Sequence, residues 1–303
     1  MSKGRIAGVI GLGSMGMGAA CSLVAAGVET WGTDVRAESV ADFVAHGGKA
    51  AASPAELASK VDALLILVVN AAQTESVLFG ETGAVKHMKE GAVVVASSTV
   101  PASYAHELEG RLTEHGLLMV DAPVSGGAGK AATGEITVMG SGRPEAFEAA
   151  DFLLNAIAAK LYRLGDQAGP GSTVKTINQL LAGIHIAAAA EAMALGIRAG
   201  VTPADLFEVI SNSAGASWMF NNRVPHILDG DYAPLSAVNI FVKDLGIVLE
   251  TGKELTFPLP LSAAAHQQFL SAAAAGLGTE DDSAVIKVFQ KLAGIDLPES
   301  KSD

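Results

Sequence analysis

Residues 5–34 read RIAGVIGLGSMGMGAACSLVAAGVETWGTD, and this stretch decides the fold class. The three elements expected within it are a strand over 5–10, a helix over 16–26 and a strand over 29–33. Gly11, Gly13 and Gly16 have the spacing G-x-G-x-x-G where the first strand ends and the helix begins. A strand, a glycine-rich turn and a helix in this order predict a βαβ unit with a parallel sheet.

The same alternation continues through the first half of the chain. Further strands are expected over 63–69, 92–96, 117–120 and 135–139, and further helices over 37–45 and 102–114. The strand runs are apolar almost throughout, which is typical of a parallel sheet covered by helices on both faces. We therefore expect an α/β N-terminal domain over residues 1–165, built as a doubly wound parallel sheet of the Rossmann type.

The second half of the chain has a different pattern. Helices are expected over 172–199, 203–211, 237–255, 260–274 and 282–292. The longest of these is rich in alanine, whose small side chain buries little area, so most of its stability must come from packing. We expect residues 166–303 to form an all-α C-terminal domain.

Composition limits the function classes. The 303 residues are 50% apolar and 17% charged, with 20 Lys+Arg against 32 Asp+Glu and a net charge of −12. An acidic chain without a basic cluster is not expected to bind nucleic acid or an anionic membrane. A single cysteine cannot form an internal disulfide, which favours a cytoplasmic protein. The uncharged stretch 6–28 contains six glycines, which argues against a signal or membrane helix, and no later apolar run is expected to span a bilayer.

The glycine-rich turn has a physical role in binding a dinucleotide. Its first glycine allows the turn, the second lets the backbone approach a pyrophosphate, and the third lets helix and strand pack closely. The cofactor-binding residues expected here are Gly11, Leu12, Gly13, Ser14, Met15 and Gly16. Asp34 follows the third glycine by 18 residues, where a carboxylate can accept the ribose hydroxyls of NAD and repel a 2′-phosphate. NAD is therefore the expected cofactor, although Arg36 lies close enough to affect the choice between NAD and NADP.

Four blocks of sequence resemble one enzyme family. They are the N-terminal glycine motif, D-A-P-V-S-G-G at 121–127, Gly169-x-Gly171-x-x-x-Lys175, and K-D-L at 243–245. With these blocks in order, the chain resembles the β-hydroxyacid dehydrogenase family over essentially its whole length. The resemblance implies a small hydroxy acid as substrate, bound in a cleft between the two domains, and a homodimer or homotetramer.

The resemblance also implies which residues act. Lys175 is at the position of the family's catalytic lysine, and on a helix it shares one face with Asn178 and Gln179. A lysine shielded from water has a pKa closer to the working pH, so it can exchange a proton with the substrate alcohol. Many relatives have Asn at the position of Gln179, so the substrate contact there is longer in this chain or is made by Asn178 instead.

The other expected site residues bind the carboxylate and the cofactor. Ser125, Gly126 and Gly127 form a turn whose hydroxyl and backbone N–H groups suit a carboxylate. By the resemblance, Val69, Asn70 and Thr99 approach the nicotinamide side of the cofactor, and Lys243 reaches the cofactor or the substrate. No His, Cys, Asp or Glu residues have the spacing of metal ligands, so no metal is expected.

These observations predict an NAD-dependent oxidation of a small hydroxy acid or sugar acid. Segments 179–183, 187–195 and 217–220 are most similar to family members that oxidise L-threonate to a 2-oxo acid. The alternatives within the family are 3-hydroxyisobutyrate and tartronate semialdehyde chemistry. A different class of protein, a catalytically silent NAD-binding interaction protein, would be expected to have lost Lys175.

Overall fold

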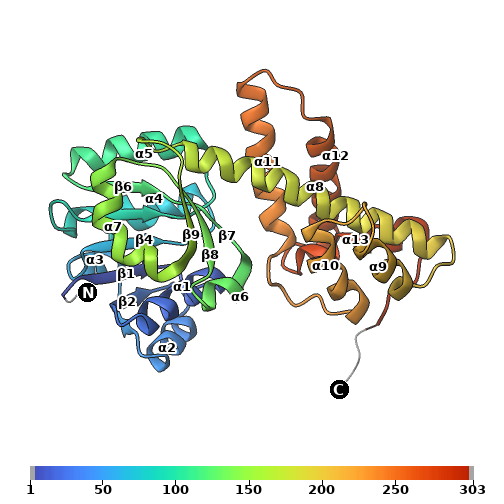
Figure 1. Cartoon of the computed structure of the whole chain (residues 1–303), viewed down its shortest axis with the longest axis horizontal. Helices are drawn as coiled ribbons and strands as arrows, with labels where there is room; N and C mark the ends of the chain where they lie inside the picture. The colour runs from blue at the N-terminus through green and yellow to red at the C-terminus, as the bar shows by residue number, and fades with distance from the viewer. Residues whose placement is uncertain (1–3, 300–303) are drawn as a thin grey trace. The chain divides into compact units, whose positions relative to one another are not determined.

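The computed structural model describes residues 4–299 (Figure 1). The chain divides into two compact units, one that ends at Lys175 and one that begins at Thr176. The first unit contains two β-sheets with helices packed on them, and the second is helical. The expected fold class, a parallel α/β domain followed by an all-helical one, is confirmed.

The main sheet of the first unit has six parallel strands. They are β1 (Ile6–Ile10), β2 (Glu29–Thr33), β3 (Lys49–Ala50), β4 (Ala63–Ile66), β5 (Val93–Ala96) and β6 (Leu118–Asp121). Their order is β3-β2-β1-β4-β5-β6, and Ile10 pairs with Thr33 on one side and Ile66 on the other. The order reverses between β1 and β4. In open sheets of this kind, ligands bind beyond the carboxyl ends of the strands at such a reversal.

Helices cover both faces of this sheet. One face is covered by α1 (Ser14–Ala25), α2 (Ala37–Ala45) and α7 (Pro144–Ile157), and the other by α3 (Pro54–Ala58), α4 (Ala71–Phe79), α5 (Ala102–Glu114) and the 3₁₀ turn η1 (Val85–His87). Successive side chains of a strand enter two separate apolar clusters, with Val9 and Leu65 in one and Ile10 and Leu64 in the other. Burial on both faces explains why the strand runs are apolar throughout.

A smaller sheet follows β6. Its strands are β7 (Val124–Ser125), β8 (Ile136–Gly140) and β9 (Ala158–Arg163), and α6 (Gly127–Ala132) connects the first two. Strand β7 runs antiparallel to β8, while β8 and β9 are parallel. The D-A-P-V-S-G-G block therefore extends from the end of the main sheet, through the first strand of the small sheet, to the first residue of α6.

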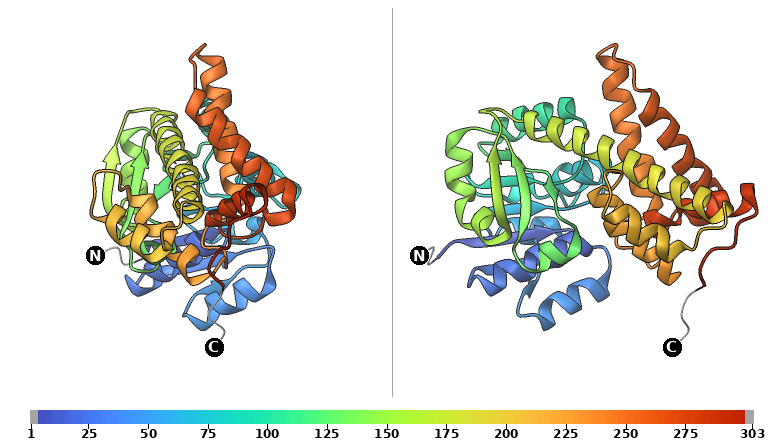
Figure 2. Two further views of the ribbon diagram at one scale, coloured as in Figure 1. Left: turned by 90° about the vertical axis from the view of Figure 1, so that its right-hand side faces the viewer. Right: turned by 45° about the vertical axis from the view of Figure 1, so that its right-hand side comes forward.

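The second unit consists of helices. They are α8 (Pro170–Arg198), which begins in the first unit, α9 (Pro203–Ser211), α10 (Trp218–Asp229), α11 (Val238–Glu254), α12 (Pro260–Ala272) and α13 (Ile286–Ala293), with a π-type turn η2 (Ala273–Leu277) and a 3₁₀ turn η3 (Asp282–Val285). Helices α11 and α12 lie side by side (Figure 2), and the rings of Phe241 and Phe269 stack with centroids 5.2 Å apart.

Helix α8 corrects one expectation. In the described part of the chain it is the helix that is long and apolar enough, by length and composition alone, to cross a membrane, so the expectation that no later run reaches this size is wrong. The reason is that no charged residue occurs between Lys175 and Glu191. Residues 186–194 of the helix nevertheless contribute to the apolar core of the second unit, and the core helix of a soluble protein has the same composition.

Candidate active site

Close packing explains two of the three glycines in the loop after β1. Gly11 has a φ of +94°, a conformation that side chains rarely adopt. A Cβ atom on it would lie 2.5 Å from the carbonyl oxygen of Leu67, and one on Gly16 would lie 1.8 Å from the carbonyl oxygen of Gly11. Only glycine fits at both positions, because the helix, the turn and the neighbouring strand end are in backbone contact.

The middle glycine faces open space instead. The atom nearest to a Cβ on Gly13 would be a guanidinium nitrogen of Arg36, at 3.9 Å. Helix α1 begins at Ser14 without a side-chain cap and without an acidic residue in its first turn. The first N–H groups of a helix need partners from outside it, and phosphates are suitable partners. The loop therefore fits the pyrophosphate of NAD.

A carboxylate stands beside this loop at the end of β2. Asp34 accepts hydrogen bonds from the backbone N–H of Leu12 at 2.6 Å and of Arg36 at 2.9 Å. The Arg36 guanidinium lies 3.4 Å from the same carboxylate and is half exposed. The structure thus brings Asp34 and the glycine loop together, as their spacing predicts for a dinucleotide site.

Polar residues also follow β4 and β5. Asn70 caps helix α4, since its Oδ1 accepts a hydrogen bond from the backbone N–H of Gln73 at 2.9 Å. The Gln73 side chain in turn accepts a hydrogen bond from the backbone N–H of Val69 at 2.8 Å. Thr99 is partly buried after the end of β5. The side-chain oxygen of Asn70 is therefore used for capping, a role that its position after a strand did not reveal.

Lys175 lies in the second turn of α8 and is only 8% exposed. Its Nζ donates a hydrogen bond to the carbonyl oxygen of Val124 at 2.9 Å. Val124 directly precedes Ser125 and the two glycines of the predicted carboxylate loop, where Gly126 has a φ of +139° and Gly127 a φ of +76°. The structure thus joins the predicted acid/base to the strand that carries the predicted carboxylate-binding turn.

A buried carboxylate anchors the start of the lysine helix. Asp121, 1% exposed at the end of β6, accepts hydrogen bonds from the N–H groups of Gly169 (3.0 Å) and Ser172 (2.9 Å) and from the Ser172 hydroxyl (2.7 Å). Ser141 donates to Asp121 at 3.1 Å and accepts from the N–H of Gly171 at 2.9 Å. Burial raises the pKa of the Asp121 carboxyl, and these hydrogen bonds oppose that effect.

The Gly-x-Gly spacing before Lys175 now has a structural reason. Gly169 has a φ of +122°, and a Cβ on Gly171 would lie 2.4 Å from the carbonyl oxygen of Met139. The preceding N–H, that of Ala168, donates to the buried side chain of Glu109 at 3.0 Å. Sequence reasoning missed the anchoring residues Asp121, Ser141 and Glu109. The one available signal was a carboxylate at the end of an apolar strand, since the bonded partners lie far apart in sequence.

In the helical unit, the remaining predicted residues form a chain of polar contacts. Asn178 Nδ2 donates to Gln179 Oε1 at 2.9 Å, and Gln179 Nε2 donates to Asp244 Oδ2 at 2.5 Å. Lys243 Nζ lies 2.5 Å from Asp244 Oδ1, as an ion pair without hydrogen-bond geometry. Gln179 and Asp244 are buried. The structure therefore connects the predicted substrate residues of α8 with the Lys-Asp pair of α11.

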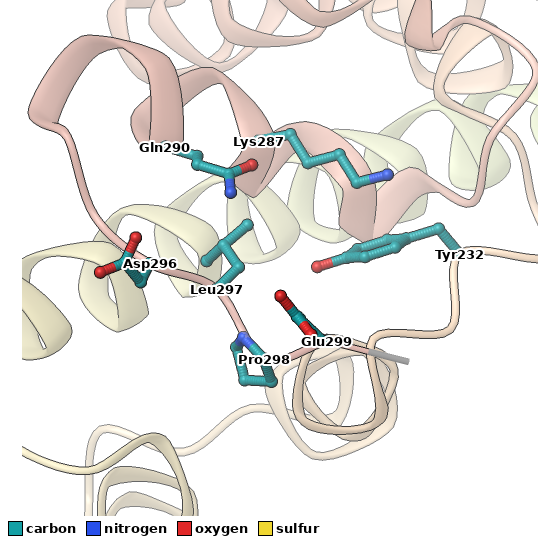
Figure 3. A pocket seen from close by; sticks show the side chains of 7 residues that line it. All are labelled: Tyr232, Lys287, Gln290, Asp296, Leu297, Pro298 and Glu299. Atoms are coloured by element: carbon teal, nitrogen blue, oxygen red, sulfur yellow. The ribbon is translucent and has the colours of Figure 1, made fainter. Parts of the chain in front are cut away.

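A cavity of about 300 Å³ lies elsewhere in the helical unit (Figure 3). Its lining residues are Tyr232, Lys287, Gln290, Asp296, Leu297, Pro298 and Glu299, and none of the predicted site residues is among them. Lys287 lies 3.9 Å above the ring of Tyr232 and pairs with Glu280, so its charge is already engaged. Among residues 4–299, no group of three or more His, Cys, Asp or Glu side chains is arranged to hold a metal ion.

Comparison with known proteins agrees with this geometry. A family model described as the NAD binding domain of 6-phosphogluconate dehydrogenase matches residues 6–165. A second, described as NAD-binding of NADP-dependent 3-hydroxyisobutyrate dehydrogenase, matches residues 169–289. The two models together span both the glycine loop and the lysine helix.

Individual relatives are similar over nearly the whole chain. L-threonate dehydrogenase of Cupriavidus necator is 62% identical over 294 residues, which are 97% of this chain and 98% of that protein. The enzyme of the same name from Escherichia coli is 55% identical over 296 residues, 97% of each chain. A crystal structure of 3-hydroxyisobutyrate dehydrogenase from Salmonella typhimurium is 55% identical, covers 94% of this chain and 99% of its own, and has a TM-score of 0.90. The chain thus belongs to the β-hydroxyacid dehydrogenase family and is an NAD-dependent dehydrogenase.

Proposed function

We propose that this enzyme oxidises L-threonate to its 2-oxo acid with NAD, and that Lys175 is the general acid/base. One observation carries the assignment of the base. The Lys175 amino group is buried and hydrogen-bonded to Val124, directly before the turn of Ser125, Gly126 and Gly127. A proton acceptor and a carboxylate-binding turn side by side are what a hydroxy acid requires.

Different residues bind the substrate carboxylate and transfer the proton. Ser125 and the N–H groups that follow it hold the substrate carboxylate, which orients the adjacent carbinol carbon. NAD, held by the glycine loop beside Asp34, would supply the hydride acceptor. Lys175 in its amine form takes the alcohol proton as the C–O bond becomes C=O, so that the alcohol loses one hydride and one proton. Burial of the lysine keeps bulk water away from this proton transfer.

Two observations support L-threonate as the substrate. Relatives with 55–62% identity are named L-threonate dehydrogenases. Asn178 offers its side-chain oxygen on the same helix face as Lys175, while both polar groups of Gln179 are bonded to Asn178 and Asp244. A methyl-bearing substrate would leave the Asn178 oxygen without a donor, which disfavours 3-hydroxyisobutyrate, the alternative that the Salmonella structure's name suggests.

We also propose a cytoplasmic homodimer or homotetramer. Helix α8 exposes three apolar side chains, Val174, Ile177 and Leu181, at successive turns of one stripe. Exposed apolar groups in such a stripe are typical of a surface that is covered in an assembly. Light scattering coupled to gel filtration would give the mass, and a monomer at working concentration would refute this proposal.

The substrate proposal is tested by a panel of hydroxy acids, with NADH formation as the readout. We expect kcat/KM for L-threonate to exceed that for 3-hydroxyisobutyrate by at least about tenfold. Tartronate semialdehyde is assayed in the reducing direction with NADH. Equal or higher efficiency with 3-hydroxyisobutyrate would refute the threonate assignment and leave the family assignment intact.

A further inference from the structure

The polar chain between α11 and α8 has a fixed direction. A carboxylate can only accept hydrogen bonds, so the Gln179 amide must turn its Nε2 toward Asp244. Its Oε1 then faces Asn178, which must turn its own Nδ2 toward Gln179. The oxygen and nitrogen of an amide are ordinarily hard to distinguish, but here the carboxylate at one end determines both orientations.

Burial and charge make this direction stable. Asp244 is 2% exposed and Gln179 is 8% exposed, so turning the glutamine amide around would set its oxygen against a carboxylate oxygen in a site with little water. The ammonium of Lys243, 2.5 Å from Asp244 Oδ1, balances the buried charge. The pair therefore acts as a fixed acceptor at the end of the chain.

The orientation of Gln179 in turn fixes the amide of Asn178, which is only partly buried. Its Nδ2 is engaged by Gln179, so its Oδ1 lies on the other side of the amide. Within residues 4–299, no hydrogen bond is donated to this oxygen. Asn178 follows Lys175 by three residues and shares its helix face. An oriented acceptor is thus available on the face that carries the proposed base.

We propose that Asn178 is a specificity-determining residue, whose Oδ1 accepts a hydrogen bond from a second hydroxyl of the substrate. Gln179 is then a positioning residue that acts through Asn178, and Asp244 determines the direction of both amides. The ligand class is a hydroxy acid with a further hydroxyl beyond the one that is oxidised. This inference rests on the proposed function and deepens it.

The experiment compares L-threonate with 2-hydroxybutyrate, which has the same carbon skeleton and the reacting hydroxyl but lacks the other two. The readout is the ratio of the two kcat/KM values in the wild type, Asn178→Ala, Gln179→Met and the double variant. We expect Asn178→Ala to lower the ratio by about tenfold or more, because the second hydroxyl loses its acceptor. Gln179→Met should lower it by a smaller factor, and adding it to Asn178→Ala should change the ratio no further.

Two controls separate specificity from folding. Asn155→Ala changes an exposed asparagine on α7 and should leave the ratio at the wild-type value. The NAD dissociation constant of each variant reports whether the protein remains folded. Methionine in place of Gln179 preserves the side-chain length but removes a donor to the buried Asp244, so its urea unfolding is measured beside that of the wild type.

Two results would overturn the inference. One is an Asn178→Ala variant that loses efficiency equally on both substrates. The other is a double variant whose losses in the ratio multiply, since Gln179 would then act on the substrate independently of Asn178. If the wild type instead prefers an acid other than L-threonate, the proposed function fails. The same ratio is then measured between that acid and its analogue without the additional hydroxyl, so the two failures remain distinguishable.

Discussion

The two parts of helix α8 are held in different ways. Residues 170–175 are fixed by hydrogen bonds that backbone N–H groups donate to buried side chains, chiefly those of Asp121 and Ser141. Residues 186–194 are held by the apolar core, where Met193 is fully buried. Hydrogen bonds are directional and tolerate little displacement, whereas apolar packing tolerates exchange of shapes. We therefore expect the activity of the enzyme to depend on residues 170–175 and its stability to depend on both parts of the helix.

The largest effect is expected from Asp121→Ala. It leaves two backbone N–H groups and two serine hydroxyls at or beside the start of α8 without their acceptor, and we expect a loss of about 4 kcal/mol in the free energy of unfolding. Urea unfolding measures this loss, and kcat should fall as well, because Lys175 is on the displaced helix. Asp121→Asn retains one acceptor and should lose less. An Asp121→Ala variant with wild-type stability and turnover would contradict the claim that hydrogen bonds to Asp121 fix the start of α8.

Met193→Ala tests the other part of the helix. Removing a buried methionine side chain should cost about 3 kcal/mol of unfolding free energy through lost burial and the cavity that remains. At a temperature where the variant is folded, we expect kcat/KM within about twofold of the wild type, since apolar packing can readjust without moving the polar end. A loss of turnover as large as that of Asp121→Ala would show that the two parts are not distinct.

Gly171→Ala probes the fit of the polar end with a single methyl group. That methyl would lie 2.4 Å from the carbonyl oxygen of Met139, so the helix start must shift, and we expect kcat to fall by about twentyfold, or about 1.8 kcal/mol. Gly110→Ala on α5 is the matched control, because nothing lies within 4 Å of its added methyl. Equal behaviour of the two variants would contradict the proposed fit.

The smallest effect concerns the cofactor site in the first unit. Asp34 lies beside the glycine loop and should repel a 2′-phosphate, so NAD should be preferred over NADP by about tenfold in kcat/KM, or about 1.4 kcal/mol. Steady-state kinetics with both cofactors measure the preference. Equal efficiency would mean that Arg36 compensates for the carboxylate.

The sequence predicts most of the main sheet, because glycine spacing and apolar runs are local signals. Strand β2 and helices α2 and α5 have the predicted bounds. Helix α10 was missed, since Pro225 lies inside it and proline ordinarily ends a helix. Strand β9 was missed because its exposed residues lack an apolar run.

The candidate site is less predictable from sequence than the fold. The glycine loop and Asp34 form one βαβ unit, so their spacing predicts that they meet. The bonds of Asp121 to residues about 50 positions later depend on tertiary structure and leave no periodic pattern. The same holds for Asp244 and Gln179, whose contact joins two helices. Residue spacing can suggest which side chains do chemistry, but not which buried groups orient them.

The most direct test of Lys175 as the general acid/base uses the variant Lys175→Ala. Its turnover of the preferred substrate and its affinity for NAD are both measured. We expect kcat to fall by about a hundredfold or more while the NAD dissociation constant is unchanged, because the lysine is bonded to Val124, next to the proposed carboxylate-binding turn. Lys175→Arg should also be poor, since guanidinium does not release its proton at working pH. Near-normal turnover of either variant would contradict the assignment of Lys175 as the general acid/base.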